Sequence, residues 1–321
     1  MVEEQAHVLI LLAFPEAIRV QYLDRLRATF PDVTVDLVEH HSKVGPYIAD
    51  ADVLITFGAH MADHVLDEAV KLRWVQALGT GVDGIADSPA LREGVVVSNL
   101  HGLHGPAVSE CVLAAMLSLA RDLRRSWANQ ARAAWQRFPV QLLDGKTVGI
   151  LGVGAIAEEL APKCAALGMR VVGISSAQRE VAGFERMWPR EQLAEAAAEV
   201  DHLVLLTPYT AETHGIISAA VLEAMKPTSF LINVARGGVV DEPALIAALR
   251  DGGIAGAALD VFSEEPLPAG HPFWTMENVL ITPHTAGFHT GYADDALPIV
   301  EENLRWFLAG DIAHIANVVR R

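Results

Sequence analysis

Short hydrophobic runs alternate with longer mixed stretches along the first third of the chain. The runs are typical of strands, and residues 15–29, between the first two runs, are typical of a helix. Short apolar strands that alternate with helices predict a parallel sheet covered by helices on both faces. The predicted strands cover residues 7–14, 33–37, 52–56, 72–77 and 95–98.

The same alternation returns in the second half, where a new α/β unit begins near Lys146. Asp241 is predicted to cap a helix that ends at Gly252, and a last helical stretch runs to about residue 309. The two halves share one order of elements, so two similar α/β domains are expected. The strands predicted here cover residues 147–151, 170–174, 202–206, 230–234, 257–259 and 279–281.

A strongly apolar helix is predicted over residues 108–119, between the two halves. Apolar residues occupy the side that carries Val112 and Met116, and Leu113 and Leu117 lie on the other side. Such a helix is expected to be buried nearly all round. It is either an interior helix of its domain or a contact between subunits, and both readings stay open from the pattern alone.

A glycine-rich turn follows the predicted strand 147–151 and precedes a helical stretch. In this GxGxxA pattern, Gly152 allows a tight turn and Gly154 lets a pyrophosphate approach the backbone, whereas Ala157 is small enough for the helix to pack on the strand. The start of the helix then offers its N–H groups to phosphate. A purely structural turn would use glycines too, but the strand–helix–strand context favours a dinucleotide site.

Composition narrows the class of protein. The chain has 321 residues, 51% of them hydrophobic, which allows two domains with sizeable cores. The net charge of −16 argues against nucleic acid and anionic membranes as partners. Cys111 and Cys164 lie in apolar helical stretches and are expected to be buried thiols. The chain does not start with basic residues, and its longest uncharged apolar run, 111–120, is too short to cross a bilayer, so a cytoplasmic protein is expected and no metal site is assigned.

Three residues that can carry chemistry stand at or just past the ends of predicted strands in the second half, where ligands bind in open α/β sheets. They are Arg236, Glu265 and His284. Taken singly, each has an ordinary reading as a surface arginine, a solvated acid or a loop histidine. Together with the glycine turn, however, they resemble the pattern of the D-isomer-specific 2-hydroxyacid dehydrogenases. The resemblance covers nearly the whole chain and is most specific in residues 231–242.

The resemblance implies hydride transfer between a nicotinamide cofactor and C2 of a small 2-keto acid. Arg236 would hold the substrate carboxylate and keto oxygen as a planar charged fork. His284 would protonate the developing alkoxide. Glu265 would orient the imidazole and favour its charged form. The catalytic set implied is therefore Arg236, Glu265 and His284.

A loop in the first half matches the family's substrate loop. In it, Gly79 and Thr80 are expected to offer backbone N–H groups to the carboxylate, although an ordinary glycine turn is the alternative. Leu78, next to them, is also assigned to the substrate site. The loops 57–60 and 288–291 are expected to shape the pocket for the substrate's side chain. His101 and His104 lie at the domain junction, and packing of a hinge is favoured over a place in the cleft.

The nucleotide contacts implied by the match begin at the glycine turn. Ser175 stands where an acidic residue usually bonds the ribose 2′-hydroxyl, and the next acid is Glu180. Two hydroxyls and Arg179 can instead bind a 2′-phosphate, so NADP is expected in preference to NAD, with a pocket that accepts both as the alternative. The cofactor residues implied are Gly152, Gly154, Ala155, Ile156, Ser175, Ser176, Arg179, Thr207, Pro208, Ala235, Arg236, Asp260 and His284.

The resemblance also implies two Rossmann- or flavodoxin-like doubly wound domains with a cleft between them. Residues 1–99 and 289–321 would form the substrate domain, and residues 100–288 the dinucleotide domain. Family members are usually dimers built through the dinucleotide domain, which favours the subunit-contact reading of helix 108–119.

Three functions stay open. A reductase of glyoxylate or hydroxypyruvate is favoured. A phosphoglycerate dehydrogenase is less favoured, because no regulatory domain is expected after the last helix. A dinucleotide-sensing module like the corepressors of this fold is a third reading, because those proteins keep the same catalytic set. Formate dehydrogenase chemistry is not favoured, because Glu265 replaces the glutamine that those relatives carry.

Overall fold

The computed structural model describes residues 5–58, 61–177 and 179–320. The chain forms two compact units, the first made of Met1–His104 and His289–Arg321 and the second of Gly105–Phe288. The first boundary lies five residues later than the predicted boundary at 99/100. Residues 100–104 stay with the first unit because Leu100 donates a backbone hydrogen bond to the Gly79 carbonyl, and His104 bonds Thr80.

The first unit is built on a six-stranded sheet in the order β13-β5-β4-β3-β1-β2. Five strands are parallel, and β13 is antiparallel at the edge. Apart from β13, this is the order of flavodoxin-like doubly wound sheets. Strands β1, β3, β4 and β5 carry almost only buried residues, as expected for a sheet covered on both faces. Their bounds are β1 His7–Leu11, β2 Thr34–Val38, β3 Val53–Thr56, β4 Trp74–Ala77, β5 Val96–Ser98 and β13 Val318–Arg320.

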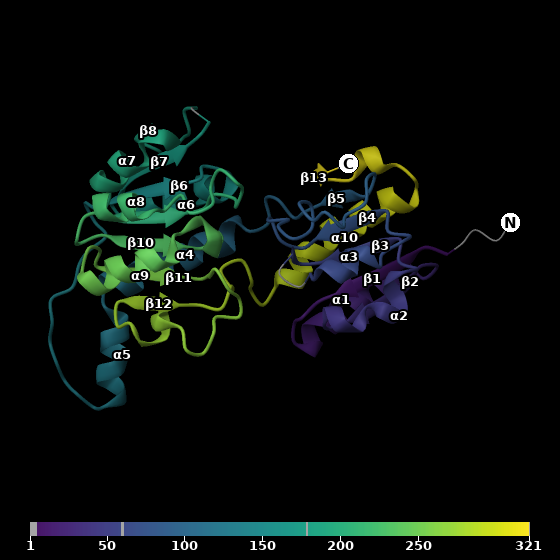
Figure 1. Ribbon diagram of the computed structural model, residues 1–321, viewed down its shortest axis with the longest axis horizontal. Coiled ribbons are helices and arrows are strands. Elements are labelled where there is room, and N and C mark those ends of the chain that lie inside the picture. The colour runs from purple at the N-terminus through teal and green to yellow at the C-terminus, as the bar shows by residue number, and fades with distance from the viewer. Residues whose placement is uncertain (1–4, 59–60, 178, 321) are drawn as a thin grey trace. The chain divides into compact units, whose positions relative to one another are not determined.

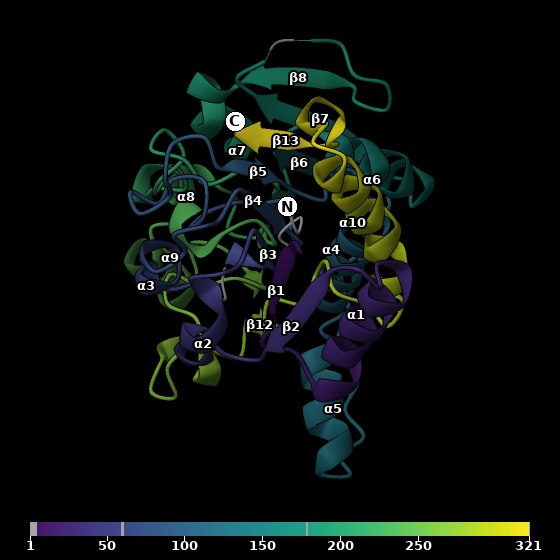
Figure 2. The same cartoon turned by 90° about the vertical axis from the view of Figure 1, so that its right-hand side faces the viewer.

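Helices α1 and α10 lie side by side in this unit (Figure 2). Pro15 precedes α1, because its fixed φ suits a helix start and its ring could not continue a helix further in. Arg25 of α1 bonds the buried carboxylate of Glu301 in α10 at 2.6 Å. The last helix therefore belongs to the first unit, although about 190 residues separate it from β5. The helices are α1 Glu16–Thr29, α2 Gly45–Ile48, α3 Asp63–Asp67 and α10 Tyr292–Leu308.

The second unit is built on a seven-stranded parallel sheet in the order β12-β11-β10-β9-β6-β7-β8 (Figure 1). This is the doubly wound dinucleotide-binding order with one added strand, and it reverses between β6 and β9. Strand β8 was not predicted, because its four residues, Arg-Met-Trp-Pro, are too few and too mixed to form an apolar run. The strands are β6 Thr147–Leu151, β7 Arg170–Ser175, β8 Arg186–Pro189, β9 His202–Leu205, β10 Phe230–Asn233, β11 Gly256–Leu259 and β12 Val279–Ile281.

Helices cover both faces of the second sheet. Alternate residues of one strand enter different cores, since Leu231 packs with α7, α8 and α9 whereas Ile232 packs with α4 and α6. The predicted caps of α9 are present: the Asp241 side chain accepts a bond of 3.0 Å from the Ala244 N–H, and Gly252 ends the helix at φ +72°. The helices are α4 Gly105–Ala120, α5 Leu123–Ala131, α6 Ala155–Ala166, α7 Leu193–Glu199, α8 Ala219–Ala224 and α9 Glu242–Asp251.

Helix α4 is not buried all round within this chain, so that prediction was wrong. Val108, Val112 and Met116 face the core, whereas the opposite stripe is exposed and includes Leu117, which is 40% exposed. The composition of the helix is apolar on both sides, but a single chain covers only one side. Beyond α4, the segment that carries α5 presents Trp127 and Trp135 to solvent.

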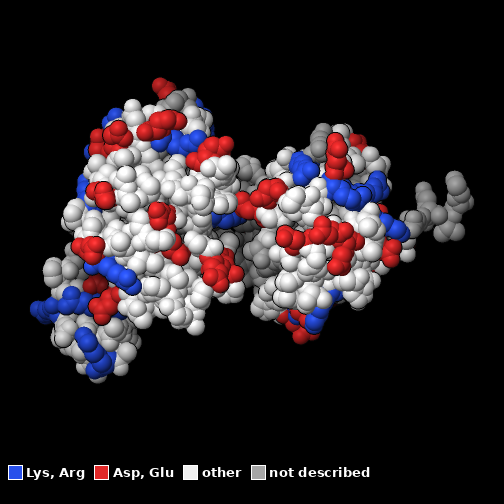
Figure 3. Space-filling view, viewed as in Figure 1, with Lys and Arg blue, Asp and Glu red and all other residues white. Residues whose placement is uncertain are grey.

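Charged side chains are distributed over both units. On the face seen in Figure 3, acidic and basic side chains are interspersed, and basic ones gather around α5 at the lower left. Among the residues described by the structure, none of the helices has the length and apolar character needed to cross a bilayer.

Candidate active site

The three predicted catalytic residues all lie in the second unit, after the carboxyl ends of its strands. Arg236 follows β10, and His284 follows β12. The His284 Nδ1 atom lies 2.7 Å from Glu265 Oε2. The other oxygen of Glu265 accepts a bond of 2.9 Å from the Phe262 backbone N–H. The carboxylate is therefore held at both oxygens, and it fixes which imidazole nitrogen points away from it.

Electrostatics keep Glu265 charged. Burial would raise the pKa of this carboxyl, but bonding to His284, the Phe262 N–H and the positive charge of Arg236 together hold it below its usual value. The ionised carboxylate holds the His284 ring at Nδ1 and so orients its Nε2 atom away from Glu265. The side chain of His284 is 40% exposed, so its Nε2 atom can exchange a proton with a bound ligand.

Close backbone packing brings the turn of Arg236 near the segment that carries Glu265. A Cβ atom built at Gly237 would lie 1.9 Å from the Phe262 carbonyl carbon, so only glycine fits there. The turn is braced by Asn233, which donates from Nδ2 to the Arg236 carbonyl at 2.9 Å and accepts from the Ala235 N–H at 3.1 Å. Sequence reasoning did not assign Asn233 a role, although it lies in the matching segment 231–242.

Asp260 builds the loop that carries His284. This carboxylate is 2% exposed and accepts from the N–H groups of Thr285 and Ala286, each at 2.9 Å, and from the hydroxyl of Thr282. The His284 N–H donates to the Asp260 carbonyl at 2.8 Å, and His284 adopts a positive φ of 52°. The structure thus gives Asp260 a place in organising the loop, and the cofactor contact expected for it stays a prediction.

The glycine turn after β6 has the geometry that the fingerprint requires. Gly152 adopts a φ of +95°, and a Cβ atom there would lie 2.5 Å from the backbone nitrogen of Thr207. Gly154 caps α6 and has nothing within 4 Å of the position where a Cβ would be, whereas Ala157 is fully buried. No side chain caps this helix. The first N–H groups of α6, which include those of Ala155 and Ile156, are therefore suited to bind a phosphate.

The loop after β7 places Arg179 beside that turn. Its guanidinium pairs with Glu158 in the first turn of α6 and approaches the Val153 carbonyl at 3.4 Å. Ser175 accepts a bond of 3.2 Å from the Ala177 N–H, and Ser176 is exposed. Sequence reasoning missed Glu158, because the pairing spans 21 residues and leaves no local pattern. Gln178, within this loop, lies outside the described residues.

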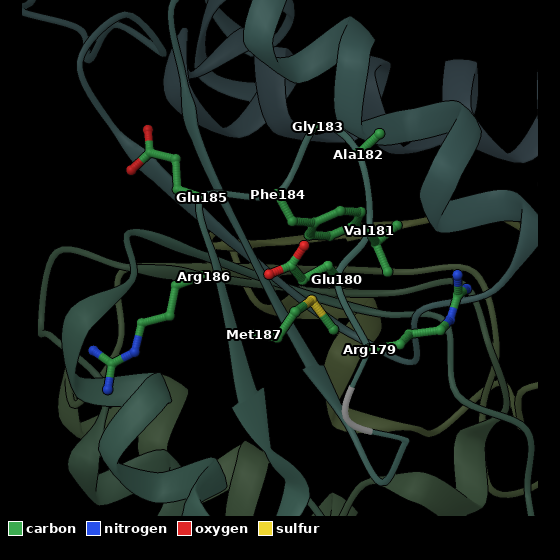
Figure 4. Close-up of a pocket in the computed structure, with 9 residues that line it drawn as sticks. All are labelled: Arg179, Glu180, Val181, Ala182, Gly183, Phe184, Glu185, Arg186 and Met187. Carbon is green, nitrogen blue, oxygen red and sulfur yellow. The ribbon is translucent and has the colours of Figure 1, made fainter.

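A hollow of about 770 Å³ lies along the segment 179–187 (Figure 4). Of the predicted cofactor residues, only Arg179 lines it, at one end. In Figure 4 the Arg179 and Arg186 side chains extend toward opposite sides of the view. This hollow includes neither the glycine turn nor the catalytic residues, so it is not the site of the chemistry.

In the first unit, the carbonyls of the predicted substrate loop are all held by hydrogen bonds. Leu78 accepts from the Tyr292 hydroxyl, Gly79 from the Leu100 N–H at 3.2 Å, and Thr80 from Asn99 Nδ2 at 2.6 Å. A trans peptide plane directs its N–H opposite to its carbonyl. The N–H groups of residues 79–81 therefore point away from these partners, an arrangement that suits an anion.

The other predicted residues of the first unit are Phe57, His101 and His104, and their surroundings differ. Phe57 packs against Phe14 and Tyr292, with ring centroids 5.1 and 6.0 Å apart, whereas residues 59 and 60 of that loop lie outside the described residues. His101 is exposed at the junction. His104 is buried and bonds Thr80 and Tyr292, so it is part of the substrate loop's support.

Comparison with known proteins decides the family. Residues 113–286, more than half of the chain, match the sequence profile described as the NAD binding domain of D-isomer specific 2-hydroxyacid dehydrogenases. The chain belongs to this family. The resemblance inferred from the motifs is thereby confirmed, as is the fold of two doubly wound parallel-sheet units.

Individual family members support an enzyme. A glyoxylate reductase of Thermococcus gammatolerans is 34% identical over 83% of this chain and 82% of its own. A D-3-phosphoglycerate dehydrogenase of Methanocaldococcus jannaschii is 35% identical over 85% of this chain, but the chain spans only about half of that relative, 52%. An NADPH-dependent glyoxylate/hydroxypyruvate reductase of Sinorhizobium meliloti, solved with NADP and sulfate, has 27% identity and a TM-score of 0.84, with 98% of both chains covered. The expectation of an NAD(P)-dependent 2-hydroxyacid dehydrogenase is confirmed.

Proposed function

We propose that this dehydrogenase is a reductase of small 2-keto acids of the glyoxylate and hydroxypyruvate type. The observation that carries the proposal is the bond of 2.7 Å between His284 Nδ1 and the ionised Glu265, beside the turn of Arg236. This set provides a proton donor, a carboxylate that orients the donor, and a cation for the substrate carboxylate. The names of the relatives from Thermococcus and Sinorhizobium support the substrate class.

The proposed roles follow from these contacts. Arg236 binds the substrate carboxylate and polarises the keto oxygen. His284 gives the proton from Nε2 to the oxygen at C2, and Glu265 holds the imidazole in the orientation that presents Nε2. The reduced nicotinamide supplies the hydride. The N–H groups of residues 79–81 bind the carboxylate, whereas the Leu78 N–H, expected to do so too, donates to the Thr56 carbonyl at 2.8 Å, so Leu78 shapes the loop instead.

The chain's glycine turn fits a dinucleotide, and we propose that it prefers NADPH. Arg179 supplies a charge-assisted contact to the 2′-phosphate, and the hydroxyls of Ser175 and Ser176 can donate to it. Glu158 competes for Arg179 and would repel the phosphate, so the preference is moderate. The other proposed contacts are Gly152, Gly154, Ala155, Ile156, Thr207, Pro208, Ala235, Asp260 and His284.

Steady-state reduction of glyoxylate, hydroxypyruvate, pyruvate and phosphohydroxypyruvate, each with NADPH and NADH, tests the proposal. Turnover of the first two acids with NADPH is expected. Turnover of the phosphorylated acid alone would favour the phosphoglycerate-type reading. Tight NADPH binding without turnover of any acid would identify a sensing module and overturn the enzymatic role.

We further propose a homodimer in which the segment 105–142 of one chain covers that of the other. This segment exposes Leu117, Trp127, Trp135 and Leu142, four large apolar side chains that are 40–91% exposed. Sedimentation analysis should give twice the 34.5 kDa chain mass. Leu117→Arg should shift the protein to monomer, whereas an unchanged dimer would place the interface elsewhere. A cytoplasmic location stays a prediction.

A further inference from the structure

A closed chain of hydrogen bonds supports the predicted substrate loop in the first unit. The Thr80 Oγ1 atom lies 2.9 Å from His104 Nδ1, and His104 Nε2 lies 3.0 Å from the Tyr292 hydroxyl. The same hydroxyl donates to the Leu78 carbonyl. This series of hydrogen bonds thus begins at Thr80 of the loop and ends at Leu78 of the same loop. His104 and Tyr292 are 188 residues apart in sequence, next to the two points where the chain passes between the units.

With a neutral His104 ring, the direction of each hydrogen bond in this series follows from the Tyr292 hydroxyl. Tyr292 is 2% exposed, and burial raises the pKa of its hydroxyl far above the usual value, so it keeps its proton. That proton is donated to Leu78, and the Tyr292 oxygen therefore accepts from His104 Nε2–H. His104 is buried, which disfavours a charged ring, and in its neutral form an imidazole that donates from one nitrogen accepts at the other. His104 Nδ1 is then an acceptor, and the Thr80 hydroxyl must donate to it.

This assignment determines what Thr80 can offer a ligand. Its only hydroxyl hydrogen is directed to His104, so its oxygen presents lone pairs alone. A carboxylate oxygen placed against it would meet another acceptor. A ligand hydroxyl, in contrast, can donate to it. The carboxylate is left to the N–H groups of residues 79–81, whose carbonyls are bonded on the opposite side.

We propose that His104 is a positioning residue that turns the Thr80 hydroxyl hydrogen inward, so that Thr80 accepts a hydrogen bond from the substrate and selects 2-keto acids with a hydroxyl on C3. The inference rests on the proposed reductase function and narrows its substrate class. Hydroxypyruvate carries this hydroxyl, whereas pyruvate has a methyl group at the same carbon. One neutral hydrogen bond corresponds to a discrimination of roughly 2- to 13-fold.

The test compares kcat/KM for hydroxypyruvate with kcat/KM for pyruvate, using NADPH and the full chain. The wild type should prefer hydroxypyruvate. Thr80→Val keeps the shape of the side chain but removes the acceptor, so the ratio should fall by roughly 2- to 13-fold. Thr80→Ser should restore it. Circular dichroism and thermal unfolding of each variant check that it folds.

Variants of His104 separate positioning from a general structural role. His104→Ala should lower the same ratio, because nothing then directs the Thr80 hydroxyl. His104→Asn places an amide oxygen near the position of Nδ1, so it should keep most of the preference. The double variant Thr80→Val with His104→Ala should be no worse than Thr80→Val alone. His64→Ala is the matched control: this half-buried histidine of the same unit bonds the His41 carbonyl, and its loss should leave the ratio unchanged.

Three results would overturn the inference. One is a wild type that shows no preference for hydroxypyruvate. Another is an unchanged ratio in Thr80→Val, and the third is full additivity of the Thr80 and His104 effects. In each case continued turnover of 2-keto acids would leave the proposed reductase function intact. A wild type that reduces neither acid would overturn both.

Discussion

The ion pair between Arg179 and Glu158 gives a graded test of cofactor selection. Both side chains are about half exposed, at 50% and 45%, so the pair is screened by solvent. Exposed pairs contribute about 0.2–1 kcal/mol. Glu158→Gln releases Arg179 for a 2′-phosphate, so we expect NADPH to bind about 1.4- to 5-fold more tightly. NADH, which has no 2′-phosphate, should bind as before.

Removal of Arg179 itself should affect NADPH binding more than removal of the charge on its partner Glu158. A hydrogen bond to a charged group contributes about 1.5–3 kcal/mol, so Arg179→Ala should weaken NADPH by roughly 10- to 150-fold. Adding Ser175→Asp places an acid at the end of β7, where it can bond a ribose 2′-hydroxyl, and should reverse the preference toward NADH.

Dissociation constants of both nucleotides, measured by fluorescence quenching at one ionic strength, check these values. Glu159→Gln is the control: it removes the same charge from the next residue of α6, but Glu159 pairs with Lys163 at 3.0 Å. Equal changes for NADH and NADPH, or the same gain in the control, would refute the role of the pair. A wild type that binds NADH tenfold more tightly would refute the reading of the whole loop.

Three further outcomes are expected. Glu265→Gln should lower kcat/KM for keto acids, because the ionised oxygen that holds His284 Nδ1 is replaced by an uncharged amide; kcat/KM between pH 5 and 9 shows the loss, and an unchanged kcat/KM would contradict the pairing. Arg236→Lys should lower kcat/KM for keto acids about 10- to 100-fold while the dissociation constant of NADPH stays the same, since the two-point geometry is lost; equal loss for both ligands would argue for a structural role. Burial lowers the pKa of His202 to about 4, whereas its value in the unfolded chain is near 6.5. The unfolded chain therefore takes up a proton first as pH falls, and the free energy of unfolding should drop by about 3 kcal/mol between pH 7 and 4. Urea denaturation at both pH values should show that His202→Leu loses this part of the pH dependence.

The sequence by itself determined the features that depend only on residues close together along the chain. The strand β6, the glycine turn and the start of α6 follow from an apolar run, a residue that tolerates φ of +95° and a small residue at Ala157. The cap of α9 by Asp241 is equally local. The segment 231–242 and the order of Arg236, Glu265 and His284 resembled the family's motifs before any distance was known, because motif matching uses only residue types and their order along the chain.

Only the tertiary structure decided which distant residues meet. The pairing of Glu158 with Arg179, and the chain from Thr80 through His104 to Tyr292, join segments whose separation along the chain is 21 and up to 188 residues. The edge strands β8 and β13 form because a neighbouring strand offers its backbone, and with four and three residues they are too short for the sequence pattern to predict them. The tertiary structure likewise decided which side of α4 stays exposed, because the rest of the chain packs against only one side of this helix. Local propensity acts over a few residues, whereas these contacts depend on how whole elements pack, and the physical information for that packing is spread over the entire chain.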